Sequence, residues 1–409
     1  MSESSPRRWY AGVEGLRAVA ALAVMAAHAS IELQGHYLPP RLVVIVFAFG
    51  LQGLTLFFCL SGFLLYGPFV NAAMGGRSLP ETRAFYRHRA LRIYPAYVVI
   101  LLVSGVLLPG VITRSAPYGH FVTDYVGRFD SVGTFLANVF LLQGYSPHTV
   151  MTGLNTSWSL LPEVVFYLLL PPMAWLAARL ARSLPTVVAW LVPPVILVVV
   201  GLVCRHVWVT HVMSAPDQNW GVYLRDSGGS WSAVFGRSFL AQAELFGAGM
   251  VAAVLLARLR DADRTPVRRL RLVAGVAIGV GLLATAAIQT DRLIASWVSL
   301  VCAGLVVLVT APRPGWLSRR LVSILESAPL SYLGRISYSI YLWHFPVILL
   351  LRHHVGGMVY HSLAGLLVSV GAVVVISVGL ASLSFRFVEA PAMTWARTRD
   401  AVRREAVRV

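Results

Sequence analysis

The sequence predicts an all-α membrane protein, a polytopic bundle of about ten transmembrane helices with both termini in the cytoplasm. The chain of 409 residues is 57% hydrophobic and only 12% charged, whereas a soluble globular chain carries about 25% charged residues. Its mean hydropathy is +0.72, and apolar runs long enough to cross a bilayer recur along its whole length. We expect one membrane domain over 1–392 and a basic cytoplasmic tail over 393–409.

Ten apolar stretches are the predicted spans, and a further apolar patch over 132–142 is too short to cross a membrane and is expected in a loop. The spans are 11–33, 43–67, 93–111, 155–178, 185–204, 235–257, 272–289, 293–311, 331–352 and 362–386. The first span resembles a secretory signal, with basic residues before it and small residues after it. Its removal would invert the distribution of arginines, so we retain it as a transmembrane helix.

The arginines predict the orientation. With the N-terminus inside, most of the arginines fall in segments that this topology places in the cytoplasm, as the positive-inside rule requires. Arg205 is among the few that fall in outside segments. The same rule explains the net charge of +17 without a nucleic-acid partner. The two longest outside stretches are 112–154 and 205–234. The second carries Trp220, Tyr223 and Trp231, which indicate either an interfacial aromatic anchor or a binding loop.

The cysteines predict neither a metal site nor a disulfide framework. Cys59, Cys204 and Cys302 lack metal-ligand spacing and lie in or beside apolar runs. We interpret them as small buried hydrophobic residues.

Ionisable residues inside the spans are few, and each costs at least ~2.5 kcal/mol at the bilayer centre. They are Glu14, Arg17, His28, Glu163, Glu244 and His344. In the first span, Arg17 and His28 are eleven positions apart, which is three helical turns plus about 20°, so both lie on one face. Glu14 is spaced to pair with Arg17. The alternative is a snorkelling arginine and a histidine that only packs.

Two further stretches combine small or basic residues with apolar ones. In "FFCLSGFLL" (57–65), Gly62 allows close helix approach, and Ser61 suits packing better than a nucleophilic role because no dedicated base accompanies it. In "RHRALRIYP" (87–95), Arg89 and Arg92 crowd the expected start of the third span, with Pro95 in its first turn. They could bind lipid phosphates or clamp a phosphate-bearing cytosolic ligand.

Two stretches place polar groups near helix ends or breaks. In "NTSWSLLPEVVFY" (155–167), Ser157 or Ser159 can cap a helix on which Glu163 and Tyr167 share a face. That carboxylate is expected near the outer boundary, where the helix dipole would stabilise it in a purely structural role. In "ISYSIYLWHFP" (336–346), a proline follows His344 in mid-span and frees a backbone carbonyl, which favours a functional site.

These stretches, in this order, resemble the acyltransferase-3 family of integral-membrane O-acyltransferases, and "FRFVEAP" (385–391) resembles its closing segment. The family's Arg, ten residues and His of the first helix fall on Arg17 and His28, and its Arg-x-x-Arg motif falls on Arg89 and Arg92. Pro162 departs from the family pattern. The resemblance implies that 1–392 is one transmembrane acyltransferase domain, in the form without a C-terminal hydrolase-like domain.

The resemblance implies transfer of an acyl group, most often acetyl, from acyl-coenzyme A to a hydroxyl, commonly on a sugar, at the plasma membrane and without a metal. Arg89 and Arg92, helped by Arg17, would hold the coenzyme phosphates. His28 would act as general base or as a covalent acyl relay. Either Glu163 or His344 would orient that histidine or assist the leaving thiolate.

Tyr167, Trp158 and Ser61 are the expected substrate contacts. The acceptor could be a cell-envelope glycan, a glycolipid or a glycosylated natural product. Membrane lipids are the other expected partner, because they surround the helices. A transporter or flippase is the rival class, because polar groups at mid-membrane and broken helices also mark transport sites.

Overall fold

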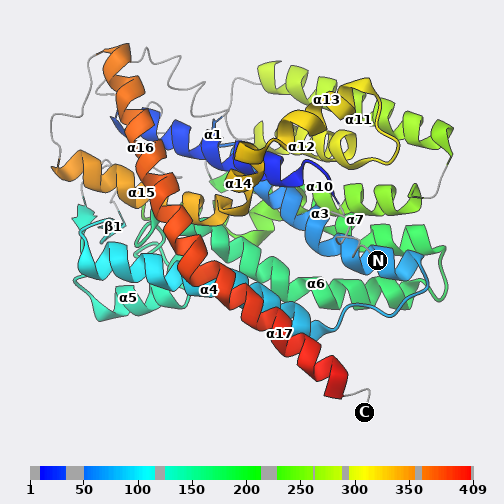
Figure 1. Cartoon of the computed structure of the whole chain (residues 1–409), viewed down its shortest axis with the longest axis horizontal. Coiled ribbons are helices and arrows are strands. Elements are labelled where there is room, and N and C mark those ends of the chain that lie inside the picture. Colours follow the sequence, from blue (N-terminus) through cyan, green and yellow to red (C-terminus); the bar gives the residue numbers. More distant parts are fainter. Residues whose placement is uncertain are drawn as a thin grey trace, which may run out of the picture.

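The computed structural model describes residues 10–33, 50–115, 125–212, 228–260, 263–287, 294–354 and 362–406. Helices make up almost all of this part of the chain (Figure 1). Its one sheet is a short antiparallel pair of β1 (Val111–Ile112) and β2 (Val126–Gly127). The predicted all-α polytopic class is confirmed.

Eight helices of the described chain are long and apolar enough to cross a membrane. The predicted spans 293–311 and 331–352 contain two shorter helices, of 17 and 18 residues. The long elements are α1 (Val13–Leu33), α3 (Gly53–Met74), α4 (Thr82–Leu102), α6 (Leu160–Leu180), α7 (Thr186–Val207), α10 (Phe239–Arg258), α11 (Arg264–Ala287), α12 (Ile294–Thr310), α15 (Ser337–His354), α16 (Leu363–Ser384) and α17 (Ala390–Ala406). The short ones are α5 (Val132–Val139), α9 (Trp231–Gly236), α13 (Trp316–Leu325) and α14 (Ala328–Arg335).

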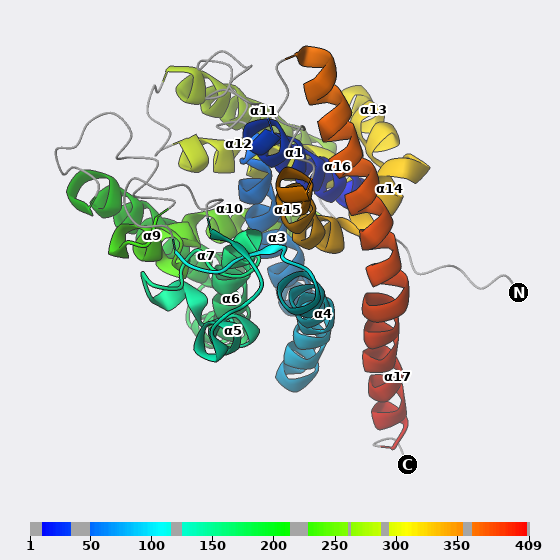
Figure 2. The ribbon, with the colours of Figure 1, turned by 90° about the vertical axis from the view of Figure 1, so that its left-hand side faces the viewer.

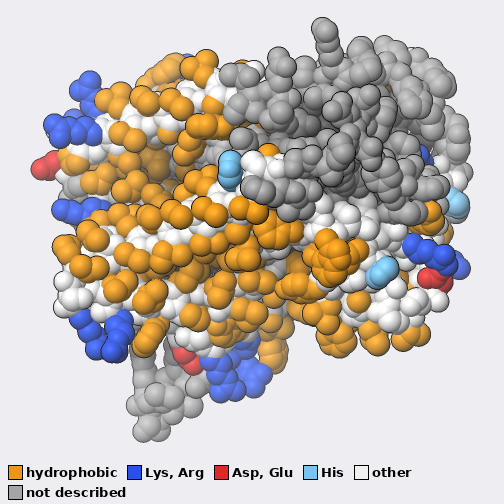
Figure 3. Space-filling model, turned by 180° about the vertical axis from the view of Figure 1, so that it is seen from behind, with side chains coloured by type: hydrophobic (Ala, Val, Ile, Leu, Met, Phe, Trp, Pro, Cys, Tyr) orange, Lys and Arg blue, Asp and Glu red, His pale blue; other side chains and the backbone are white. Residues whose placement is uncertain are grey.

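The surface agrees with a membrane location. On the face shown in Figure 3, hydrophobic side chains form a broad continuous area, while arginines gather towards its edges. Exposing a broad apolar surface to water is energetically unfavourable, so this surface is expected to face lipid.

The third span differs from its prediction. The helix begins at Thr82 rather than near 93, so Arg89 and Arg92 lie within α4 and not at its start. Pro95, predicted in a first turn, therefore lies inside the helix. A membrane helix tolerates such a proline because neighbouring groups satisfy the freed carbonyl. The prediction followed the apolar run alone and therefore missed the polar first half of α4.

Three smaller expectations also change. The patch at 132–142, expected in a loop, contains α5, whose N-cap Ser131 accepts a hydrogen bond from the Thr134 amide. Arg205, assigned to an outside segment, is buried within α7. The first residues of the predicted span 43–67 lie outside the described part of the chain, and the helix there begins at Gly53.

The core is built where three spans meet around one aromatic ring. Phe246 of α10 stacks on Phe58 of α3 and on Phe166 of α6, with ring centroids 4.7 and 4.5 Å apart. The predicted close approach at Gly62 is present, because a methyl group there would collide with the backbone oxygen of Phe246. Gly249 of α10 faces the backbone oxygen of Cys59 in the same way. Small residues let these two backbones touch.

The C-terminal segment is helical and docks on α4. A π-helical segment, η6 (Phe385–Glu389), joins α16 to α17 without a break, so no helix end falls at the expected domain limit of 392. Figure 2 shows this long helix running along one side of the molecule past α4. Asp400 of α17 pairs with Arg87 and His88 of α4, which fixes the two helices side by side.

Candidate functional site

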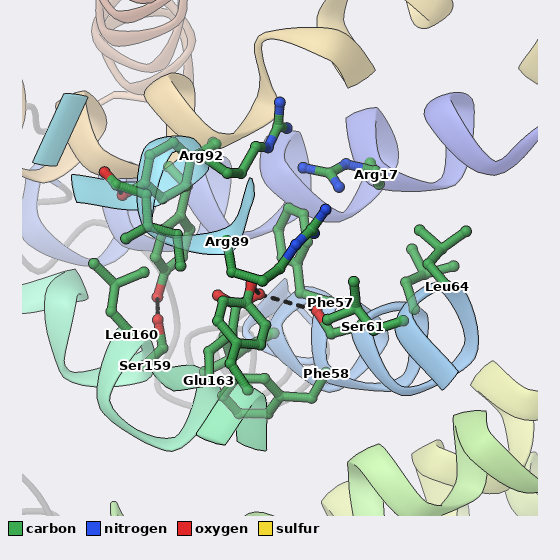
Figure 4. A pocket seen from close by; sticks show the side chains of 17 residues that line it. Arg17, Phe57, Phe58, Ser61, Leu64, Arg89, Arg92, Ser159, Leu160 and Glu163 are labelled. Atoms are coloured by element: carbon green, nitrogen blue, oxygen red, sulfur yellow. Dashed lines mark hydrogen bonds between the residues drawn. The ribbon is translucent and has the colours of Figure 1, made fainter. Parts of the chain in front are cut away.

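A small cavity of about 100 Å³ lies where α1, α3, α4, α6 and α15 converge. Figure 4 shows Arg17, Arg89 and Arg92 on one side of it, with Ser61 and Glu163 facing them. Six of the candidate site residues predicted from the sequence line this cavity: Arg17, Ser61, Arg89, Arg92, Glu163 and Tyr167. They come from four helices, α1, α3, α4 and α6.

The cavity's carboxylate is held by two hydroxyls. Glu163 Oε1 accepts a hydrogen bond from Ser61 Oγ at 3.1 Å and another from Tyr167 OH at 2.5 Å. The second bond realises the shared helical face expected from the spacing of these residues. A 3₁₀ segment, η4 (Asn155–Ser159), precedes α6, and Glu163 lies in the first turn of α6, as predicted, with its side chain lining the cavity.

The expected helix cap of α6 is not formed. Ser159 occupies the N-cap position without a side-chain bond to the helix, and its hydroxyl instead meets Tyr341 OH at 2.9 Å. Ser157 accepts a hydrogen bond from Gln143 Nε2 at 3.2 Å. Both serines are thus used between elements, which local capping rules do not foresee.

The three guanidinium groups leave much of their hydrogen-bonding capacity unused. Arg89 lies 6.0 Å from the ring centres of both Phe85 and Tyr167, and its buried Nε has no hydrogen-bond partner in the described structure. One nitrogen of Arg92 donates to Met393 Sδ at 3.2 Å, a weak acceptor. Such a set of under-satisfied cations suits a multiply charged anion.

Arg17 contacts α15 and not the acidic residue predicted for it. Its Nε and one terminal nitrogen donate to Ser337 Oγ at 3.2 and 3.1 Å. Glu14 is exposed, so the expected ion pair within the first helix is absent from the described structure. The neighbouring span competes successfully because it offers a buried hydroxyl, whereas an exposed carboxylate can remain hydrated.

His28 and His344 contact each other between α1 and α15, the two helices that Arg17 and Ser337 also join. His28 Nδ1 of α1 lies 2.9 Å from His344 Nε2 of α15. His344 is fully buried, and its Nδ1 lies 3.3 Å from the backbone oxygen of Ile340. A carbonyl only accepts, so we assign the His344 proton to Nδ1 and the bridging proton to His28 Nδ1. This assignment leaves the lone pair of His28 free on Nε2.

Both contacts place Arg17 and His28 on one side of α1. Each of these side chains meets α15, at Ser337 and at His344 respectively. The two helices therefore run in the same direction, which agrees with their predicted places as first and ninth spans. This is the geometry that the spacing within the first span predicts.

The histidine pair adjoins the small cavity without lining it. Tyr341 links the two, because it lines the cavity and its ring centre lies 5.7 Å from that of His344. The tyrosine hydroxyl also donates to the backbone oxygen of Thr156 at 3.0 Å. A ligand extending through the cavity would thus meet Tyr341 before the imidazoles.

Trp158 lies elsewhere. It does not line the small cavity, and the guanidinium of Arg237 stacks over its ring at 5.3 Å. Trp220 and Tyr223 of the expected anchor or binding loop lie outside the described residues. Trp231 is exposed.

Sequence reasoning missed Ser337 and Tyr341, although a signal for them exists. With His344 they occupy positions i, i+4 and i+7 of α15, which form one helical stripe. It also missed a large cavity of about 420 Å³ that shares Arg17, Leu64 and Arg92 with the small one. The large cavity's remaining lining residues are Tyr10, Gly12, Val13, Glu14, Gly15, Leu325, Glu326, Ser331, Gly334, Arg335, Phe385, Met393 and Arg397.

Known proteins share this sequence pattern. The family model described as the acyltransferase domain, that of the acyltransferase-3 family, matches residues 10–382. Acyltransferase MdmB of Streptomyces mycarofaciens is 32% identical over 181 residues, which cover 43% of this chain and 41% of that protein. Peptidoglycan O-acetyltransferase OatA of Listeria monocytogenes is 24% identical over 391 residues, which cover 94% of this chain and 56% of that protein.

No solved structure gives a significant match. The chain spans about half the length of the curated relatives it matches. Because the family model covers most of the chain, including both histidines and the three cavity arginines, the chain belongs to the acyltransferase-3 family.

Proposed function

We propose that this protein is an O-acyltransferase of the plasma membrane that moves an acyl group, most simply acetyl, from cytosolic acyl-coenzyme A to a hydroxyl of a saccharide-containing acceptor. The observation that carries the proposal is the layout of the α1–α15 interface. A cavity with three under-satisfied arginines lies at one end, and an imidazole with a free lone pair lies further along the same helices.

The cavity supports the choice of donor. Coenzyme A carries several phosphate charges, which guanidinium groups bind with paired hydrogen bonds. Arg17, Arg89 and Arg92 would meet these charges, and the narrow thioester arm would pass Tyr341 towards the histidines. The positive-inside distribution of arginines supports a cytosolic origin of the donor.

The histidine pair supports the chemistry. His28 Nε2 would take the proton of the acceptor hydroxyl as its oxygen attacks the thioester carbonyl. The carbon–sulfur bond then breaks, and the resulting imidazolium returns the proton to the leaving thiolate. His344 would act as a positioning residue. Its Nε2 accepts a hydrogen bond from the Nδ1–H group of His28, which favours the tautomer of His28 with its lone pair on Nε2. General bases of this kind contribute typically ~10²–10⁴-fold.

The relatives support the kind of acceptor. One is named for O-acetylation of peptidoglycan, a polymer rich in sugar hydroxyls, and the other is named only as an acyltransferase. A saccharide hydroxyl, in the envelope or on a natural product, is the acceptor class that both names allow.

The proposal is tested in cells and with purified protein. Mass spectra of envelope glycans, glycolipids and secreted metabolites are compared between cells with and without the gene, and between cells carrying the wild-type chain and His28→Ala. We expect one species to lose an acyl mass in both comparisons. Purified protein in nanodiscs, given acetyl-coenzyme A and that species, should release free thiol. Transport of the acceptor without thiol release would instead support a flippase.

The covalent variant is separated by omitting the acceptor. Radiolabel from acetyl-coenzyme A that carries ¹⁴C in its acetyl group would indicate an acyl-histidine relay if it accumulates on the wild-type chain and not on His28→Ala. Full turnover by a folded His28→Ala protein would contradict both routes.

A further inference from the structure

The proposed chemistry assigns no role to the large cavity, although its size and charge suit a ligand. It measures about 420 Å³, which falls within the range of about 300–1,000 Å³ typical of small-molecule sites. The small cavity, at about 100 Å³, is below that range. Arg17, Leu64 and Arg92 line both cavities, so the wide compartment and the narrow one lie next to each other with two guanidinium groups at their border.

The lining of the large cavity carries two more arginines. Arg335 ends α14 and Arg397 lies on α17, and both are exposed. Arg335 stacks on Tyr332 at 5.7 Å, and neither arginine forms an ion pair within the described residues. With Arg17 and Arg92 they outnumber the two carboxylates of the lining, Glu14 and Glu326. The compartment therefore has an excess of positive charge.

The C-terminal helix holds one of these arginines in place. Met393, Arg397 and Asp400 occupy positions i, i+4 and i+7 of one stripe of α17. The first contacts Arg92, the second lines the large cavity, and the third pairs with α4. Arg397 also lies beyond residues 10–382, the part of the chain that the family model matches.

We propose that the large cavity binds the phosphorylated nucleotide end of the donor, with Arg335 and Arg397 as ligands of its 3′-phosphate. This inference rests on the proposed use of acyl-coenzyme A. The nucleotide fits the wide compartment, the diphosphate lies at the junction with Arg17 and Arg92, and the pantetheine arm enters the small cavity. Two exposed arginines thus select a donor that carries the extra phosphate.

The test measures binding and needs no acceptor. Purified protein in nanodiscs is titrated with coenzyme A, 3′-dephospho-coenzyme A and pantetheine. We expect the wild type to prefer coenzyme A over the dephospho form by about tenfold or more, as charge-assisted phosphate contacts allow. Arg335→Ala and Arg397→Ala should each weaken coenzyme A binding and leave affinity for the dephospho form and pantetheine unchanged. Arg319→Ala, an exposed arginine of α13 outside both cavities, is the matched control.

The outcomes separate this inference from the proposed function. A wild type that binds none of the three probes overturns the donor assignment itself. If the wild type binds coenzyme A, but without preference for the 3′-phosphate or with equal strength in both cavity variants, the donor assignment stands and the nucleotide site is wrong. Thermal unfolding of each variant verifies that the fold is retained, which the exposure of both side chains favours.

Discussion

His28 and His344 join the first predicted span to the ninth through a single contact of 2.9 Å between Nδ1 and Nε2. Because a backbone oxygen only accepts, the contact of His344 Nδ1 with Ile340 assigns the His344 proton to Nδ1, and this assignment gives the pair a direction. The buried histidine accepts, and the histidine of α1 donates and retains a free nitrogen. A hydrogen-bond acceptor at 344 is therefore what the arrangement requires, more than a titratable group.

Replacing His344 tests that requirement. We expect His344→Ala to lower kcat by about 10- to 100-fold, at or below the lower end of what a general base contributes, because His28 loses its tautomer and orientation. The KM for the donor should change little, since His344 does not line the cavity. His344→Asn, whose carbonyl can accept the same proton, should recover part of the rate.

A steady-state assay of thiol release with each variant measures this split. Equal loss in the Ala and Asn variants would contradict a positioning role through the Nε2 acceptor. A large rise in the KM would show that the residue acts on donor binding instead.

Ser61 is expected to be dispensable for the chemistry. Its hydroxyl donates to Glu163 Oε1, and that carboxylate also receives the Tyr167 hydroxyl. Ser61→Ala should therefore retain turnover within a few-fold, because Glu163 keeps one partner and the other hydrogen bond is worth about 1 kcal/mol. The rate of acyl transfer is the measurement, with Ser30→Ala on α1 as a control outside the cavity. A loss of more than 100-fold would identify Ser61 as a nucleophile or substrate ligand.

The helical plan and most of the cavity residues could be predicted from the sequence for a simple reason. A bilayer imposes length and hydrophobicity on each span, and polar residues inside it are too costly to be accidental. Arg17 and Glu163 follow from that cost alone, whereas Arg89 and Arg92 were predicted from their place in a basic cluster at the expected start of the third span. Helical spacing within one span then brings Arg17 and His28 to a common face.

Contacts between spans could not be predicted in this way. Nothing local indicates that Arg17 meets Ser337, or that His344, rather than Glu163, contacts His28, because these pairs are more than 300 residues apart. Helix starts were the other weak point. The polar first half of α4 hides a helix that begins at Thr82, since amphipathic and basic turns do not add to an apolar run.

The buried ion pair between α7 and α10 should be essential as a pair. Arg205 Nε lies 2.5 Å from Glu244 Oε1, which also accepts from Ser296 Oγ at 2.7 Å. Both charged side chains are at most 5% exposed. Arg205→Met should lower the free energy of unfolding by about 3–5 kcal/mol, because it leaves an uncompensated buried charge.

The double variant Arg205→Met with Glu244→Leu should regain most of that stability, because an apolar pair of similar size avoids the desolvation cost. Reversible unfolding in mixed micelles measures the wild type, Arg205→Met, Glu244→Leu and the double variant side by side. Losses that simply add in the double variant would contradict direct coupling between the two side chains.

The contact of α3 with α10 makes the sharpest stability prediction. Gly249 faces the backbone oxygen of Cys59 with no room for a methyl group, and a backbone cannot move aside as a flexible side chain can. Gly249→Ala should therefore destabilise the protein by about 1–3 kcal/mol, the usual cost of overpacking, despite the better helix propensity of alanine. Gly279→Ala on α11 is the matched control, because a Cβ there meets nothing within 4 Å. It should be neutral or stabilising by up to about 1 kcal/mol, and equal thermal shifts in the two variants would show that helix propensity rather than backbone contact decides the outcome.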